Sequence, residues 1–174
     1  MIYIAIESCK SDPASQKVAA KKAKKLLFSR LGIECDITKS ENGKPLLSDE
    51  RYHISFSHSG NVAICALRCR EECYALPDNV FTIFEDGEGD IGADIELIPP
   101  EKDLERLNRI SMRFMKRKFN TVTELIKRWT LCESFTKLHD VPLAESFKTH
   151  ITDTLAFSGI VSVGDEDYYL TVLI

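Results

Sequence analysis

The 174-residue sequence predicts an α+β fold built from two similar halves. Ile2, Ile4 and Ile6 alternate with other residues, which is typical of a strand with one buried face. A helical pattern and further strand-like runs follow, and the order of strand, helix and strands returns after about residue 90. No literal repeat accompanies this recurrence, but it predicts an N-terminal half over residues 1–88 and a C-terminal half over residues 89–174.

One long helix is expected in the first half, over residues 13–31. Asp12 and Pro13 form an N-cap and first-turn pair, and Gly32 is a favourable stop. An apolar stripe between them is typical of a packed helix face. Four lysines on the opposite face fit either solvent or a phosphate ligand, and the solvated face is the preferred interpretation.

Two strands are predicted after this helix, at residues 53–57 and 61–67, and a polar turn joins them as a hairpin. Residues 68–90 are richer in polar residues and glycine. We expect a linker or an inserted hairpin there, with a short strand at residues 80–84.

The second half is expected to begin with a strand at residues 91–97, which a pair of prolines ends. Helical patterning dominates residues 101–139, with a break near Asn120. Two further strands, at residues 149–161 and 168–174, are expected to follow.

The composition is that of an ordinary globular protein, with 44% hydrophobic residues, 29% charged residues and a net charge of −4. The negative charge argues against a nucleic-acid partner, and no apolar run approaches the roughly 18 residues of a membrane span. The N-terminal segment lacks the basic flank of a signal peptide. Six cysteines without a Cys-x-x-Cys pair are expected to be reduced thiols rather than disulfides or zinc ligands. We therefore expect a cytoplasmic monomer with no nucleic-acid or membrane partner.

Asp94 and Glu96 stand two residues apart in a predicted strand, so their side chains project to the same side. Neighbouring carboxylates on an otherwise apolar strand repel each other, unless a cation lies between them or both face water. Magnesium suits such a pair, because it takes one or two carboxylates together with water and substrate phosphate. The pair alone leaves a metal site and a solvated strand end both open.

Glu133 and Lys137 stand four residues apart in the second predicted helical segment and therefore share one helix face. They form either a surface ion pair or a third metal ligand beside a phosphate-binding cation. Trp129, one turn earlier, is typical of a core anchor.

At the predicted hairpin tip, Ser57 and His58 stand among small hydroxyl residues next to Gly60. Backbone and side-chain donors of such a turn could meet phosphate oxygens, although a lone histidine is more often structural. No Gly-x-Ser-x-Gly elbow supports a hydrolase.

Four motifs taken in order resemble the phosphopantetheinyl transferase superfamily, in its longer, pseudo-dimeric branch. They are GKP at residues 43–45, FSHSG at 56–60, GADIE at 92–96 and WTLCESFTK at 129–137. The resemblance implies two related α+β halves that form a pseudo-dimer, with the active site and coenzyme A between them.

The same resemblance implies a reaction and the residues for it. Magnesium would assist the transfer of the 4′-phosphopantetheine arm of coenzyme A, the substrate, to a serine of an apo acyl or peptidyl carrier protein. The implied magnesium ligands are Asp94, Glu96 and Glu133. The implied contacts to coenzyme A are Lys44, Ser57, His58 and Lys137. Glu133, Lys137 and His58 are the implied catalytic residues.

Three departures from the family pattern accompany the resemblance. The short N-terminus leaves no clear match for the basic residues that the longer branch places before its first helix. Cys132 stands where the family usually has a lysine, and a neutral thiol cannot replace an ammonium group. Residues 71–90 correspond to an insertion. The alternative to an active transferase is therefore a catalytically weakened coenzyme A-binding protein of the same fold.

Overall fold

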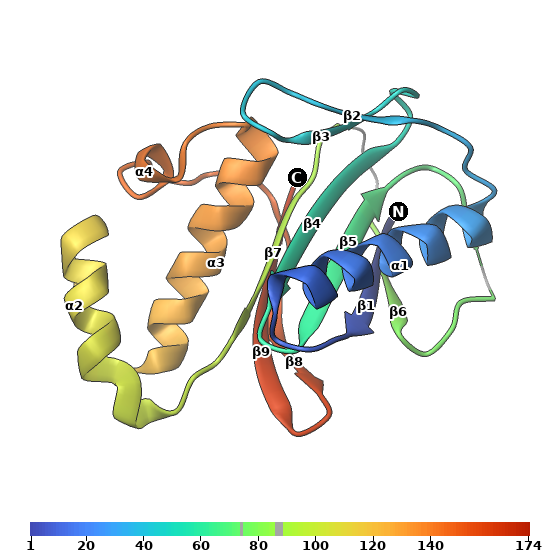
Figure 1. Cartoon of the computed structure of the whole chain (residues 1–174). Coiled ribbons are helices and arrows are strands. Elements are labelled where there is room, and N and C mark those ends of the chain that lie inside the picture. Colours follow the sequence, from blue (N-terminus) through green and yellow to red (C-terminus); the bar gives the residue numbers. More distant parts are fainter. Residues whose placement is uncertain (74, 86–88) are drawn as a thin grey trace.

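The computed structural model describes residues 1–73, 75–85 and 89–174, which form a mixed α+β fold (Figure 1). Two antiparallel sheets lie in the middle of the molecule, with a long helix against the first and a helical layer against the second. A small hairpin of β2 (Ile37–Lys39) and β3 (Pro45–Leu47) runs across the top of this view. The α+β class predicted from the sequence is confirmed.

The first sheet has the strand order β4-β5-β1-β6. Its central strands are β1 (Ile2–Ser8) and β5 (Val62–Arg68), and β4 (His53–Ser59) and β6 (Val80–Ile83) form its edges. Residues of β1 are buried on both faces, not on one as the alternation predicted. The reason is that Ile2 and Ile4 pack toward the second sheet while Tyr3 and Ala5 pack into the cluster under the first helix.

The first helix, α1 (Pro13–Leu31), begins and ends where the sequence predicts. The Asp12 side chain accepts the Ser15 N–H at 2.9 Å, which satisfies a donor that the first turn leaves without a helical partner. Gly32 ends the helix in the left-handed conformation at φ 65.

The second sheet has the strand order β7-β9-β8, with β9 (Glu166–Leu173) between β7 (Gly92–Leu97) and β8 (Leu155–Val163). The predicted strand at residues 149–161 starts only at Leu155. The backbone N–H groups of Lys148 and Thr149 instead bond back to carbonyls of α4 (Leu143–Ser146), so this stretch closes a helical turn.

Helices occupy residues 101–139 with a break near Asn120, as predicted. The 3-10 turn η1 (Glu101–Asp103) leads into α2 (Leu104–Phe114), and α3 (Val122–His139) follows the break. Thr121 caps α3 by accepting the Glu124 N–H at 3.1 Å.

The short strand predicted at residues 80–84 forms as β6 and pairs with β1, so it adds an edge to the first sheet. The other described residues of segment 69–90 form neither helix nor strand. Position 74 and positions 86–88 of the expected insertion, including the predicted half boundary at residue 88, lie outside the described residues.

Within the ranges that the structure describes, no helix combines the length and apolar character needed to cross a membrane. All six cysteines are free thiols in the structure.

Candidate active site

The candidate site lies where α3 crosses β7, and Gly92 makes that close crossing possible. A Cβ at this position would lie 2.0 Å from the Ser134 carbonyl oxygen and 2.8 Å from the Leu138 nitrogen. No side chain fits in that space, so only glycine lets the helix approach the strand to this distance. Asp94 and Glu96 follow on the same side of β7 as Gly92 and therefore face α3.

Asp94 is the most buried acid of the site, at 2% exposure. Its Oδ1 accepts two hydrogen bonds of 2.6 Å, one from Lys137 Nζ and one from the Ser57 hydroxyl. Lys137 also donates to the Ala93 carbonyl at 3.2 Å. The second carboxylate oxygen, Oδ2, is buried and has no hydrogen-bond partner among the described residues.

Glu96 and Glu133 lie close enough to Asp94 to sense its charge. Burial, together with the charge of Asp94, raises the pKa of Glu96 to about 7, although a hydrogen bond from Ser59 acts in the opposite direction. Burial and the charge of Asp94 also raise the pKa of Glu133, against the lowering effect of Lys137. The group is thus short of positive charge, because one lysine faces three carboxylates.

Of the seven residues implied by the resemblance, four meet at this point: Asp94, Glu96, Glu133 and Lys137. Ser57 joins them through Asp94. His58 is exposed at the end of β4, and its side chain projects to the sheet face opposite Ser57.

Lys44 has internal partners instead of an open position. Its side chain is 7% exposed, and Nζ donates to Asp90 Oδ2 and to the Leu138 carbonyl, both at 2.6 Å. The second bond reaches a carbonyl in the last turn of α3, where a cation is favourable. Lys44 therefore ties the β2–β3 hairpin to the helix that carries Glu133 and Lys137.

Cys132 does not face the carboxylates. It is fully buried, and its Sγ lies 3.7 Å from the Ser146 carbonyl oxygen in α4. Adjacent helix residues point in different directions, so Glu133 turns toward β7 while Cys132 packs against α4. Position 132 is therefore a packing position.

The carboxylates offer a donor set for a hard cation, but not a complete cage. Across residues 1–73, 75–85 and 89–174, no group of three or more His, Cys, Asp or Glu side chains is placed to hold a metal ion. The unpartnered Asp94 Oδ2 and the excess of negative charge nevertheless fit Mg²⁺, which takes only one or two carboxylates and completes its shell with water and phosphate oxygens.

Sequence reasoning missed two groups of this region, Asp90 and Ser59. Asp90 accepts from Lys44 and interacts with His53 Nδ1 at 3.3 Å. Ser59 donates to Glu96 Oε2 at 2.6 Å. The serine spacing at 55, 57 and 59 was the available signal, because alternate residues of one strand share a face.

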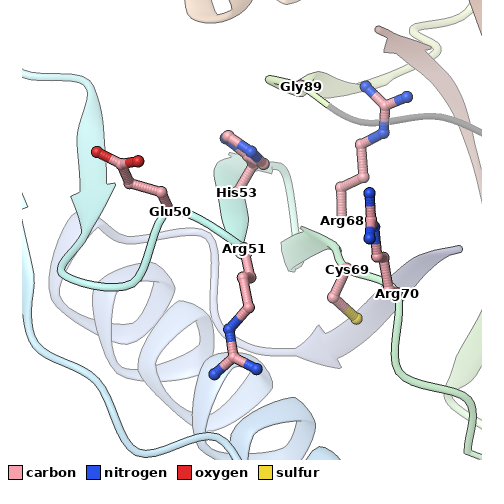
Figure 2. A pocket seen from close by; sticks show the side chains of 7 residues that line it. All are labelled: Glu50, Arg51, His53, Arg68, Cys69, Arg70 and Gly89. Carbon is pink, nitrogen blue, oxygen red and sulfur yellow. The ribbon is translucent and has the colours of Figure 1, made fainter.

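A pocket of about 660 Å³ lies at the other end of β4 and is shown in Figure 2. It is lined by Glu50, Arg51, His53, Arg68, Cys69, Arg70 and Gly89. Carboxylates already face three of its basic groups: Arg51 lies 2.6 Å from Asp49, Arg68 lies 2.8 Å from Glu85, and His53 lies near Asp90. These pairings neutralise the charge on which binding of an anion by these three groups would depend.

No protein-family model matches the chain, and no curated protein matches it.

Proposed function

We propose that this protein transfers the 4′-phosphopantetheine arm of coenzyme A to a serine of an apo acyl or peptidyl carrier protein, with Mg²⁺ as cofactor. One observation carries the proposal: Asp94, Glu96, Glu133 and Lys137 come from two separate elements and form one partly buried group in which three carboxylates face one lysine. The order of the four motifs along the chain supports the same reaction.

We also propose that the chain is a pseudo-dimer of two related halves. In the first sheet β5 lies between β4 and β1, and in the second β9 lies between β8 and β7. The strands β1, β4 and β5 thus correspond to β7, β8 and β9. In each half the first of these strands, β1 or β7, is followed by the helical part, and the other two form a hairpin. This common order supports two halves with the site where β4 of one meets β7 of the other.

Of the implied ligands Asp94, Glu96 and Glu133, one or two would bind Mg²⁺ directly, and the ion would supply charge stabilisation for the pyrophosphate of coenzyme A. Lys137, which lies beside Asp94, would also stabilise the negative charge that develops on the pyrophosphate. His58, which is exposed at the hairpin tip, would contact a phosphate of coenzyme A. Lys44 and Ser57 would support the site through the internal bonds described above.

In the proposed step, the carrier serine oxygen attacks the phosphorus of the phosphopantetheine arm. The bond from that phosphorus to adenosine 3′,5′-bisphosphate breaks, and this nucleotide leaves with the bond's electron pair. Glu133 would take the serine proton, directly or through a water molecule. The other residues position the reactants and stabilise charge.

The test is incubation of the protein with coenzyme A, Mg²⁺ and an apo carrier protein, followed by intact-mass measurement of the carrier. A mass increase by one phosphopantetheine is the expected result. An unchanged carrier together with bound coenzyme A would instead establish the weakened binding protein, and release of inorganic phosphate would indicate a phosphatase. We also propose that the protein acts as a monomer in the cytoplasm, where its six cysteines would stay reduced.

A further inference from the structure

Three serines on β4 face the edge of β7 in a regular row. Ser55, Ser57 and Ser59 are alternate residues of one strand, so their hydroxyls project from the same face. Each reaches β7, although the two strands belong to different sheets. The row therefore links the two sheets through side chains instead of a backbone ladder.

The three hydroxyls differ in what they bind. Ser55 bonds to the backbone of Ala93: its Oγ accepts the Ala93 N–H at 3.0 Å and donates to the Ala93 carbonyl at 3.4 Å. Ser57 donates to the Asp94 carboxylate at 2.6 Å. Ser59 accepts the Leu97 N–H at 3.0 Å, and its own hydrogen goes to Glu96 Oε2 at 2.6 Å.

These bonds fix one oxygen of each carboxylate. A carboxylate only accepts hydrogen bonds, and Asp94 Oδ1 already takes those of Ser57 and Lys137. Its Oδ2 is buried without a partner among the described residues, which is costly for a charged group unless a ligand completes it. In Glu96, Oε2 is held by Ser59. A metal ligand is held in direction by such outer hydrogen bonds.

We propose that Ser57 and Ser59 are positioning residues that orient Asp94 and Glu96 toward a divalent cation, whereas Ser55 only joins the two strands. This inference rests on the proposed function, because it takes these carboxylates as ligands of the metal. It assigns Ser57 to the carboxylates and not to the nucleotide end of coenzyme A.

The test measures Mn²⁺ binding by electron paramagnetic resonance, with coenzyme A present and no carrier protein, so that turnover plays no part. Ser57→Ala and Ser59→Ala should each weaken Mn²⁺ binding about tenfold or more, which is the usual loss when an outer hydrogen bond to a metal ligand is removed. Ser57→Thr, which keeps the hydroxyl, should restore the affinity. Ser55→Ala is the matched control: it removes a buried bond to the same strand, and Mn²⁺ affinity should stay unchanged.

Thermal unfolding of each variant shows whether it is folded. Ser59 is less buried than Ser57, so Ser59→Ala still allows the Mn²⁺ affinity to be measured if Ser57→Ala does not fold. Equal Mn²⁺ affinity in the wild type, Ser57→Ala and Ser59→Ala would overturn the inference while leaving the metal site in place. An equal loss in Ser55→Ala would also overturn it, because strand joining would then explain all three effects. A wild-type protein that binds neither Mn²⁺ nor coenzyme A would instead overturn the proposed function, and this inference with it.

Discussion

Lys137 Nζ lies 2.6 Å from Asp94 Oδ1, in a pair whose carboxylate side chain is only 3% exposed. The pair connects α3 to β7. Among the described side chains that donate to Asp94, Lys137 supplies the positive charge and Ser57 is neutral. Breaking such a pair leaves a buried charge without compensation, which costs far more than the pair itself contributes.

Lys137→Met should therefore destabilise the protein by about 3 kcal/mol, measured as the free energy of unfolding in urea. Lys127→Met, an exposed lysine of the same helix, is the matched control and should change it little. The double variant Lys137→Met with Asp94→Asn should lose less than the sum of the single losses, because no uncompensated charge remains. Additive losses would contradict a direct pairing.

Gly92→Ala should disturb the crossing of α3 and β7, since the new methyl group would meet the Ser134 carbonyl oxygen. We expect a loss of about 3 kcal/mol or more in the free energy of unfolding. Gly164→Ala provides the comparison: it lies in a turn at φ 61 with nothing within 4 Å, so only backbone strain of about 1 kcal/mol applies. Similar losses in both variants would argue against the close approach.

Lys44→Met tests whether Lys44 supports the fold or binds the nucleotide. Removal of its bonds to Asp90 and the Leu138 carbonyl should lower the free energy of unfolding by about 2 kcal/mol. Lys39→Met, an exposed lysine on the same hairpin, should have little effect. Weaker coenzyme A binding with unchanged stability would show a nucleotide contact instead.

Asp90 should make stability sensitive to acid. Burial alone would raise the pKa of Asp90, but hydrogen bonds with His53 and Lys44 and the charge of Lys44 lower it to about 2. The unfolded value is near 3.9, so the charged form favours the folded state. This contribution is complete above pH of about 4 and disappears as the pH falls through about 2.

The comparison is the free energy of unfolding of the wild type and Asp90→Asn between pH 5 and pH 2. The stability advantage of the wild type should shrink as the pH falls, because its own Asp90 becomes neutral. A difference that stays constant over this range would show that the charge of Asp90 does not stabilise the fold.

We propose that the carrier docks at the end of α2, where four exposed basic residues follow closely in sequence: Arg113, Lys116, Arg117 and Lys118. Phe114 is 50% exposed beside them. The resemblance implies acidic carriers, so Lys116→Glu with Lys118→Glu should slow carrier association roughly tenfold and weaken its salt dependence. Coenzyme A affinity should not change.

The matched control for the carrier surface is Lys21→Glu with Lys25→Glu, which makes the same charge change on exposed positions of α1. A similar slowing in the control would indicate a general charge effect. Unchanged kinetics in both variants would show that this end of α2 is a solvated face.

The sequence alone determined the elements whose signals are local. Asp12 and Gly32 bound α1, the break near Asn120 separates α2 from α3, and alternation placed Asp94 and Glu96 on one side of β7. Capping, chain stops and strand alternation act over a few residues, so they can be read without knowledge of the rest of the chain.

Only the tertiary structure decided which distant groups meet. It placed the Lys44 ammonium group at the end of α3, and it brought the Ser57 and Ser59 hydroxyls to the two carboxylates of β7. It also turned Cys132 away from the site. These contacts depend on how closely α3 approaches β7 and how β4 meets it, and those distances come from long-range packing, which includes the missing side chain of Gly92.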